Sequence, residues 1–224
     1  MNAPSTPNQI QAVIDQTGQP LAYIEGFAYF YGRQFQLSPA TLIPRPETQD
    51  MIDITKSLMG YLAERRVLDV GTGSGCIAIT LALELGKNVN ITATDISQPA
   101  LTIARANAKH HKVNITFLHS DLFQNLKKQQ FDLIVANLPY VDPNWPWLDQ
   151  KSLAYEPAIA LYAQDKGLAL IKKFLRKAPQ HLKPNGTILL EHDPSQFAEL
   201  SKYAQQHHFA PTSHTPYITQ LTLV

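Results

Sequence analysis

The sequence has one cysteine in 224 residues, Cys76, which excludes an internal disulfide bond and suits a reducing compartment. It also lacks an excess of charge of either sign, because 19 Lys and Arg residues accompany 18 Asp and Glu residues. The longest apolar run, residues 76–83, is far too short to cross a bilayer, and the first residues contain no apolar core of a secretory signal. We therefore expect a cytoplasmic protein with no membrane partner and no direct nucleic-acid partner.

Histidines do not form a pattern that would bind a metal. The pairs His110-His111 and His207-His208 are adjacent in sequence, and neighbours on a helix point apart. We predict no metal site. Cys76 stands at the start of a predicted helix, where we expect a buried, small apolar side chain.

What the chain does have is 44% hydrophobic residues, enough for one domain with a substantial core. Along the chain, short apolar segments that suit strands alternate with longer segments that suit helices. Strands are predicted at 66–70, 90–95, 114–119, 131–136 and 186–191, and helices at 76–86, 97–110, 167–182 and 194–208. This alternation predicts an α/β fold with a doubly wound, mostly parallel sheet. Residues 217–224 are predicted to add an antiparallel strand at its edge.

The N-terminal part is organised differently. Residues 1–20 are predicted to be a tail or one short helix, and residues 21–224 one domain. Residues 27–38 predict a β-hairpin with a turn at Gly32-Arg33. Two prolines stiffen residues 41–47, and Pro46 suits the first turn of a helix through about Leu62. The predicted apolar face of that helix consists of Met51, Ile54, Leu58 and Leu62.

The most informative segment is Asn137-Leu138-Pro139-Tyr140, which follows the buried strand predicted at 131–136. In an open α/β sheet, ligands bind at the carboxyl ends of the strands. The segment combines a planar amide, a rigid backbone with exposed carbonyls and a flat aromatic face. Such a set suits a planar NH2 group, either an amide or the exocyclic amine of a base. Taken without context, the same four residues would be an ordinary turn.

A second segment, Gly71-Thr72-Gly73-Ser74-Gly75, links the first strand to a helix. Glycines there allow a sharp turn and a close approach of a ligand to backbone amides. The spacing is G-x-G-x-G, whereas a dinucleotide site has G-x-G-x-x-G to hold a pyrophosphate. A NAD-linked dehydrogenase is therefore the weakest reading. The spacing favours a ligand that has no pyrophosphate, such as S-adenosylmethionine (AdoMet).

Three acidic residues at successive strand ends fit the same ligand. Asp69 can meet the ammonium of the methionine part, Asp95 can accept the ribose hydroxyls, and Asp121 can accept the adenine amino group. Each acid alone could equally be a helix cap or a turn residue. Together with the glycine segment, they predict an AdoMet site.

With these features, the chain resembles the protein-(glutamine-N5) methyltransferases that modify peptide chain release factors. The resemblance covers about residues 21–195 as ordered blocks. Besides the two segments already described, these are Tyr23-Ile24-x-Gly26, Phe30-Tyr31-Gly32, Leu42-Ile43-Pro44-Arg45-Pro46-Glu47-Thr48, Asp95-Ile96-Ser97, Ala106-Asn107-Ala108, Tyr155-Glu156-Pro157 and Leu182-Lys183-Pro184-Asn185-Gly186. The Ile-Pro-Arg-Pro-Glu-Thr block is the most specific, because general AdoMet enzymes lack it.

The resemblance implies a Rossmann-like class I methyltransferase fold with seven strands and an N-terminal hairpin. It implies methyl transfer from AdoMet, leaving S-adenosylhomocysteine, to a glutamine in the Gly-Gly-Gln loop of a release factor. The expected protein is a monomer. Catalytic roles are expected for Asn137, Leu138, Pro139 and Tyr140; cofactor contacts for Asp69, Gly71, Thr72, Gly73, Ser74, Gly75, Asp95, Ile96, Asp121, Leu122 and Asn137; and acceptor contacts for Arg45, Pro46, Glu47, Asn137, Pro139 and Tyr140.

The chain departs from the family pattern in three places. Leu138 stands where the family has a proline, which is similar to the motif of rRNA adenine-N6 dimethyltransferases, and Gln49 stands where the family has Glu. Only about twenty residues precede Leu21, where the family has a helical domain of several dozen residues. Two alternatives therefore stay open: an adenine-N6 methyltransferase acting on RNA or DNA, which would present a similar NH2 group, and a non-catalytic binding module with the same fold.

For the reaction itself, we expect the Asn137 side-chain oxygen and the Leu138 carbonyl to accept the two amide N–H bonds of the acceptor, with Tyr140 packed against the amide. No dedicated base is evident. Arg45 and Glu47 either shape the acceptor pocket or pair with each other at the surface. The sequence leaves two further roles open: Glu156 as a backbone acceptor or a lid anchor, and the Trp145 and Trp147 segment as a lid or surface packing.

Overall fold

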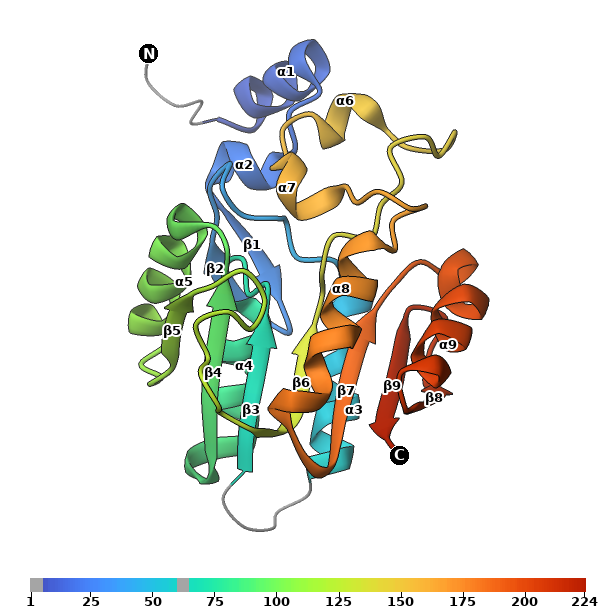
Figure 1. Ribbon diagram of the computed structural model, residues 1–224. Coiled ribbons are helices and arrows are strands. Elements are labelled where there is room, and N and C mark those ends of the chain that lie inside the picture. Colours follow the sequence, from blue (N-terminus) through green and yellow to red (C-terminus); the bar gives the residue numbers. More distant parts are fainter. Residues whose placement is uncertain (1–5, 60–64) are drawn as a thin grey trace.

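A computed structural model describes residues 6–59 and 65–224 of the chain. Its centre is a seven-stranded sheet in the order β5-β4-β3-β6-β7-β9-β8 (Figure 1). Five strands are parallel: β3 (Arg65–Val70), β4 (Val89–Asp95), β5 (Thr116–His119), β6 (Phe131–Ala136) and β7 (Leu182–Glu191). The mostly parallel, seven-stranded sheet expected from the sequence is thus confirmed.

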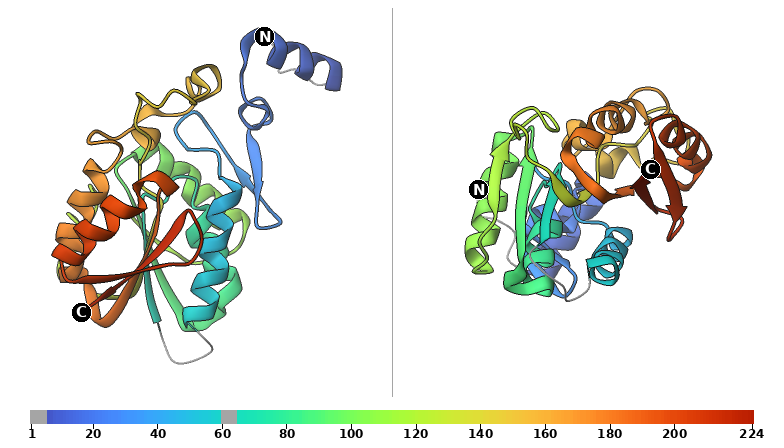
Figure 2. Two further views of the ribbon diagram at one scale, coloured as in Figure 1. Left: turned by 90° about the vertical axis from the view of Figure 1, so that its right-hand side faces the viewer. Right: turned by 60° about the horizontal axis from the view of Figure 1, so that its bottom comes forward.

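Helices cover both faces of the sheet, as Figure 2 shows from the side. One face carries α3 (Gln49–Met59), α4 (Cys76–Leu85) and α5 (Gln98–His110), and the other carries α8 (Ala169–Lys177) and α9 (Phe197–Gln206). The remaining helices of the described residues are α1 (Pro7–Thr17), α2 (Leu21–Glu25), α6 (Gln150–Leu153), α7 (Ala158–Leu161) and the 3-10 turns Pro46–Thr48, Gly86–Asn88, Ala178–His181 and Pro194–Gln196. No helix in the described ranges is long and apolar enough to cross a membrane.

The order of the strands creates a crevice at one point of the sheet. The chain enters at β3, runs outward through β4 and β5, and then returns to β6 on the other side of β3. The connections that leave β3 and β6 therefore diverge to opposite sides, and ligands of doubly wound folds bind where this happens. Because β3 and β6 are buried on both faces, their apolar runs hold this point rigidly.

Contrary to the prediction, the C-terminal strand does not lie at the edge of the sheet. Strand β9 (Ile218–Leu223) pairs antiparallel with β7 on one side and with β8 (Phe209–Ser213) on the other. The sequence pattern missed β8 because it is short and contains Pro211. Proline has no N–H to donate, and it is tolerated on the edge strand that β8 turns out to be.

The predicted hairpin is present, but its turn is one residue earlier than expected. Strands β1 (Phe27–Phe30) and β2 (Arg33–Gln36) pair so that Phe30 faces Arg33. The two-residue turn is therefore Tyr31-Gly32, with φ values of 50° and 72°. Positive φ at both positions is typical of the type I′ turn, whose twist matches that of paired strands.

Two helices also begin later than predicted. The helix expected at 167–182 begins at Ala169, because Asp165, Lys166 and Gly167 have φ values of 58°, 54° and 85° and form a turn instead. In the helix expected at 194–208, residues Pro194–Gln196 form a 3-10 turn. The α-helix itself begins at Phe197 and ends at Gln206.

The apolar face of α3 is rotated relative to the prediction. Met51 is buried as expected, but Leu58 is 39% exposed, and Ile52, Thr55 and Met59 complete the buried face. Leu62, the last residue of the predicted face, lies outside the described residues.

One buried side chain ties the hairpin to the sheet. The Asn107 amide on α5 accepts a hydrogen bond from the Gln36 N–H (2.8 Å) and donates to the carbonyls of Gln36 (3.0 Å) and Ser74 (2.9 Å). Asn107 is only 2% exposed, and its bond to the Ser74 carbonyl is buried. It therefore joins β2, α5 and the segment after β3.

We predict that Asn107→Ala lowers the free energy of unfolding by about 2–4 kcal/mol, because three backbone groups lose their partner and one of them, the Ser74 carbonyl, is in a buried place. Urea denaturation followed by circular dichroism measures the effect. Lys109→Ala, on the exposed side of the same helix, is the control and should change stability by less than about 0.5 kcal/mol. Equal losses in the two variants would contradict the role given to Asn107.

Candidate active site

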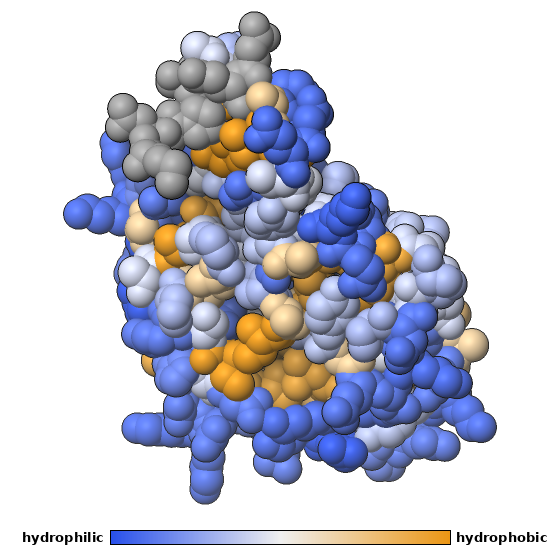
Figure 3. All heavy atoms as spheres, turned by 90° about the horizontal axis from the view of Figure 1, so that it is seen from above, coloured by the Kyte–Doolittle hydropathy of each residue, from blue (hydrophilic) through white to orange (hydrophobic). Residues whose placement is uncertain are grey.

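A cavity of about 460 Å³ opens at the carboxyl ends of the parallel strands. Its walls come from the segments that follow β3, β4, β5 and β6, together with part of the 40–48 loop and residues from 159 to 173. Figure 3 looks onto this rim and shows apolar residues gathered within a hydrophilic border. The strand-end segments singled out in the sequence thus meet around one hollow.

The glycine segment after β3 is held by backbone hydrogen bonds from Gly71 and Thr72 to the Thr94 carbonyl (2.8 and 2.9 Å). Gly71 has φ 77°, and a Cβ there would lie 3.2 Å from Leu138 Cδ2. Gly75 has φ 83° and is also needed for packing, since a Cβ would lie 3.0 Å from Ile79 and 3.2 Å from Ala104. Gly71, Thr72, Gly73 and Ser74 line the cavity, whereas Gly75 lies behind it.

Asp95 lies on the cavity wall at the end of β4. Its Oδ2 accepts from the Gly73 N–H and its Oδ1 from the Ser97 N–H, both at 2.8 Å. Burial raises the pKa of this carboxyl above its ordinary value. The neighbouring Ile96 also lines the cavity and is 49% exposed, so a polar acceptor and an apolar surface stand side by side.

Asp69 does not line the cavity. It is fully buried under the glycine segment, and its Oδ2 accepts a hydrogen bond of 2.6 Å from the Thr72 hydroxyl. Burial raises the pKa of Asp69 to about 7. Asp69 therefore supports the glycine segment through Thr72. It does not reach the cavity, where the sequence predicts that it contacts the ligand.

At the end of β5, Asp121 and Leu122, for which cofactor contacts are predicted, both line the cavity. The Asp121 Oδ2 pairs with Lys173 Nζ of α8 at 2.6 Å, and each side chain is a little over a third exposed. Lys173 also lines the cavity, and sequence reasoning missed it because nothing in its position along α8 marks it. Leu122, with φ 51°, is 5% exposed.

Asn137 reaches the cavity from the end of β6, beside Leu138 and Pro139. Its Nδ2 donates to the Thr48 hydroxyl at 3.2 Å. Among residues 6–59 and 65–224, its Oδ1 makes no hydrogen bond of its own. One N–H of the amide is thus engaged by Thr48, and the oxygen is available to a ligand, for which it can act only as an acceptor.

Tyr140 lies behind this wall. Its hydroxyl donates to Glu191 Oε1 at 3.1 Å, and burial beside Glu191 raises the pKa of the phenol. Glu191 ends β7 and is 0% exposed; burial raises its pKa to about 7, although Thr48, Tyr140 and Asn137 act to lower it. We had not singled out Glu191, but an acid that directly follows the apolar run at 188–190 was a signal comparable to the three acids used above.

In the 40–48 loop, Arg45 lines the cavity, whereas Pro46 and Glu47 do not. Of the two alternatives for Arg45 and Glu47, the surface pair is not the one observed, because Arg45 pairs with Glu156. Glu156 is 6% exposed and also accepts from the Ile43 N–H at 3.1 Å, so it acts as a backbone acceptor for this loop.

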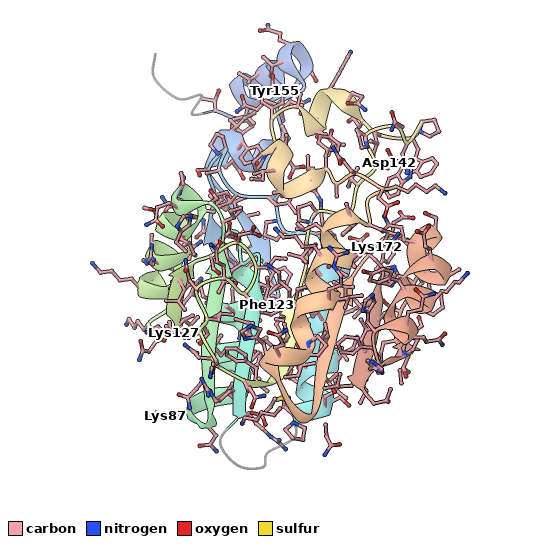
Figure 4. All side chains as sticks on the ribbon, in the orientation of Figure 1. Lys87, Phe123, Lys127, Asp142, Tyr155 and Lys172 are labelled. Carbon is pink, nitrogen blue, oxygen red and sulfur yellow. The ribbon has the colours of Figure 1, made fainter. Side chains whose placement is uncertain are left out.

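The segment between β6 and α8 covers one side of the cavity mouth. The Tyr155 hydroxyl donates to the Thr17 carbonyl of α1 at 2.9 Å, which joins the segment to the N-terminal helix (Figure 4). The rings of Trp145 and Trp147 stack at 5.3 Å, and Trp147 is 64% exposed. The tryptophans therefore pack on each other at the surface.

Cys76 is 8% exposed and lines the inner wall, and burial raises the pKa of its thiol to about 12. The thiol is therefore protonated at neutral pH, in keeping with the apolar role expected. Within the described ranges, no three His, Cys, Asp or Glu side chains group as a metal site requires.

Comparison with known proteins gives a consistent result. The methyltransferase small domain family matches residues 48–145. The release factor glutamine methyltransferase of Koribacter versatilis (strain Ellin345) is 44% identical over 176 residues, 78% of this chain and 62% of that protein. That of Neisseria gonorrhoeae (strain ATCC 700825 / FA 1090) is 38% identical over 210 residues, covering 92% of this chain and 76% of that protein. The bifunctional methyltransferase of Rickettsia prowazekii (strain Madrid E) is 40% identical, covering 82% of this chain and 39% of that protein.

The chain thus spans less than two thirds of the length of the Koribacter and Rickettsia proteins. Solved structures share the fold. The 16S rRNA N2 G1207 methyltransferase of T. thermophilus, in complex with AdoMet and guanosine, has a TM-score of 0.63 at 18% identity, covering 88% of this chain and 50% of that one. The ribosomal protein L11 methylase of Lactobacillus delbrueckii subsp. bulgaricus has a TM-score of 0.59 at 21% identity, covering 80% and 78%.

We predict that Asp69→Asn becomes more stable relative to the unmodified protein as pH rises. The folded-state pKa of Asp69, about 7, lies above its unfolded value, so stability falls as the pH rises from the unfolded pKa to the folded one. The neutral Asn does not have this loss, and the difference should grow by on the order of 3 kcal/mol between pH 5 and pH 8. Urea denaturation at the two pH values measures it.

The matched control is Thr80→Val, which replaces another fully buried polar group but does not titrate. Its difference from the unmodified protein should be the same at both pH values. A pH-independent difference for Asp69→Asn as well would show that the buried carboxyl does not ionise between these values.

Proposed function

Since this chain belongs to the family of release factor glutamine methyltransferases, we propose that it transfers a methyl group from AdoMet to the side-chain amide nitrogen of a glutamine, in the Gly-Gly-Gln loop of a peptide chain release factor. The observation that carries this proposal is the placement of Asn137. Its amide nitrogen is held by Thr48, and its oxygen stays available on the cavity wall beside the glycine segment. The methyltransferase domain is residues 21–224, acting as a cytoplasmic monomer.

The cavity wall fits AdoMet. The glycine segment brings backbone amides close to the hollow without side chains in the way, which suits a carboxylate. The Asp95 carboxylate is fixed by two backbone N–H groups, and its remaining lone pairs can accept from the ribose hydroxyls. Ile96 and Leu122 provide apolar surface for the adenine, and Asp121 stands next to it as an acceptor for the amino group. When bound, AdoMet would supply an electrophilic methyl group.

The acceptor amide must be oriented, because its nitrogen lone pair is delocalised into the carbonyl. Asn137 Oδ1 and the Leu138 backbone carbonyl would accept its two N–H bonds. Both acceptors also stabilise the positive charge that develops on the nitrogen during transfer. Pro139 keeps the backbone of this segment stiff, and holding the nitrogen at the cavity supplies much of the remaining acceleration. The packing of the Tyr140 ring on the amide stays a prediction, since Tyr140 lies behind the wall here.

Leu138 stands where the family has a proline, as in the motif of rRNA adenine-N6 dimethyltransferases, and so favours one second candidate, methylation of adenine N6 in RNA or DNA. An exocyclic amine presents the same NH2 group to the same two acceptors. The two functions differ in what must reach the cavity: a flexible glutamine side chain or a base turned out of its stack.

The deciding experiment incubates the protein with AdoMet and either a release factor or rRNA. Mass spectrometry of the Gly-Gly-Gln peptide should show one added methyl group on glutamine, and digested rRNA should show no N6-methyladenine above background. Methylated adenine with unmodified glutamine would favour the second candidate. Calorimetry that detects no AdoMet binding would instead favour a non-catalytic module.

We predict that Asn137→Ala lowers kcat for glutamine methylation at least about 100-fold, because it removes an acceptor that stabilises the transition state. AdoMet binding, measured by calorimetry, should persist. The control is Asn144→Ala, since Asn144 is an exposed asparagine that hydrogen-bonds to Asp142 and does not line the cavity. Near-normal rates in a folded Asn137→Ala protein would rule out the proposed role.

A further inference from the structure

The connection from β7 to α9, residues 191–196, contacts Tyr140 at two separate points. We propose that Glu191 and Gln196 are positioning residues. Glu191 holds the Tyr140 hydroxyl and Gln196 holds the Tyr140 carbonyl, and together they fix residues 137–139, which are proposed to bind the acceptor amide. This inference rests on the proposed function of those residues. Neither Glu191, Gln196 nor Tyr140 lines the cavity, so their effect on a ligand must pass through the wall that they support.

Gln196 provides the contact with the backbone. Its Nε2 donates to the Tyr140 carbonyl (2.7 Å) and to the Lys166 carbonyl (2.8 Å), and its Oε1 accepts from the Asp193 N–H (3.0 Å). Both amide hydrogens and the oxygen are therefore used, in a side chain that is 4% exposed. A glutamine amide satisfied on three sides has one orientation, which it imposes on the Tyr140 peptide group.

Glu191 provides the contact with the side chain. The Tyr140 hydroxyl donates to its Oε1, and the carboxyl is completely buried. The other carboxyl oxygen, Oε2, is buried without a hydrogen-bond partner among the described residues. Glu191 therefore acts on the site through its hydrogen bond with the Tyr140 hydroxyl, on the residue that follows Pro139.

A third segment removes the free space around this arrangement. Gly167, with φ 85°, passes so close that a Cβ there would lie 1.9 Å from the Tyr140 carbonyl oxygen and 2.4 Å from Gln196 Nε2. The turn at residues 165–167 thus presses the Lys166 carbonyl against the same amide that holds Tyr140. Any side chain at position 167 would push these groups apart.

Proline makes the link from Tyr140 to the site stiff. Pro139 has a fixed φ, which removes one of the backbone torsions that separate the Tyr140 carbonyl from the Leu138 carbonyl, one of the two proposed acceptors. A displacement of Tyr140 is therefore passed on to that carbonyl more directly than through a freely rotating residue. A misplacement of about 1 Å in such groups can cost on the order of 100-fold in rate. The contacts of Tyr140 therefore act on the transition state rather than on AdoMet affinity.

The first test is Gln196→Met, which keeps the shape of the side chain and removes both donated hydrogen bonds. We expect kcat for glutamine methylation to fall about 10- to 100-fold, while KM for the acceptor and the AdoMet Kd change by less than about twofold. The matched control is Gln130→Met, because Gln130 also donates its amide to a backbone carbonyl, that of Leu182, but at the opposite end of β6. An unchanged kcat in folded Gln196→Met, with only a lower Tm, would overturn the inference.

The second test uses Glu191 and separates its chemistry from its packing. Glu191→Gln keeps an oxygen that can accept from the Tyr140 hydroxyl, so kcat should stay within about threefold. Glu191→Leu and Tyr140→Phe should each lower kcat about tenfold, and their combination should lower it no further than either alone. Additive losses, or equal losses in Glu191→Gln and Glu191→Leu, would contradict the proposed contact.

A readout without activity keeps the inference independent of the proposed function. Hydrogen exchange of the peptide covering 137–141 should be faster in Gln196→Met than in the unmodified protein and unchanged in Gln130→Met. If the unmodified protein methylates no glutamine, the proposed function fails while this comparison still tests the contacts of Tyr140. Equal exchange in all three proteins would refute them.

Discussion

The candidate site depends on the close approach of two segments that leave neighbouring strands in opposite directions. The glycine segment after β3 and residues 137–139 after β6 meet at Gly71, where a Cβ would lie 3.2 Å from Leu138. A side chain at that position would push the two walls apart. Because the strands beneath are buried on both faces and fixed by parallel pairing, the geometry of the hollow is set by the sheet rather than by mobile loops. This is the arrangement that precise orientation of two reacting groups requires.

Behind each wall stands a buried carboxyl. Asp69 supports the glycine segment through Thr72, and Glu191 supports the residues after β6 through Tyr140. Burial raises the pKa of both to about 7, which means that the fold tolerates an unfavourable environment for their charge. The structural role of these two acids is to accept hydrogen bonds from the Thr72 and Tyr140 hydroxyls. The walls are then held by buried groups that do not themselves touch the hollow.

The third side of the hollow is built from parts that lie far apart in sequence. Glu156 accepts from Ile43 and pairs with Arg45, so the segment between β6 and α8 and the proline-rich loop form one unit. Tyr155 connects the same unit to α1, and Lys173 of α8 pairs with Asp121 on the cavity wall. Three connections of different origin therefore hold together the segments that line the hollow beside the glycine segment.

The sequence alone determined the parallel sheet, the two segments that meet at its rim and the acids at the strand ends, because these follow from local periodicity and from residue types with few alternatives. It also determined the family. It could not determine which acids face the hollow: Asp69 and Asp95 look alike in sequence, and only the packing of the strands buries one and leaves the other at the wall. The partners of Arg45, Tyr140 and Asn137 likewise lie dozens of residues away. Contacts of that kind depend on how the layers pack, and no local pattern encodes them.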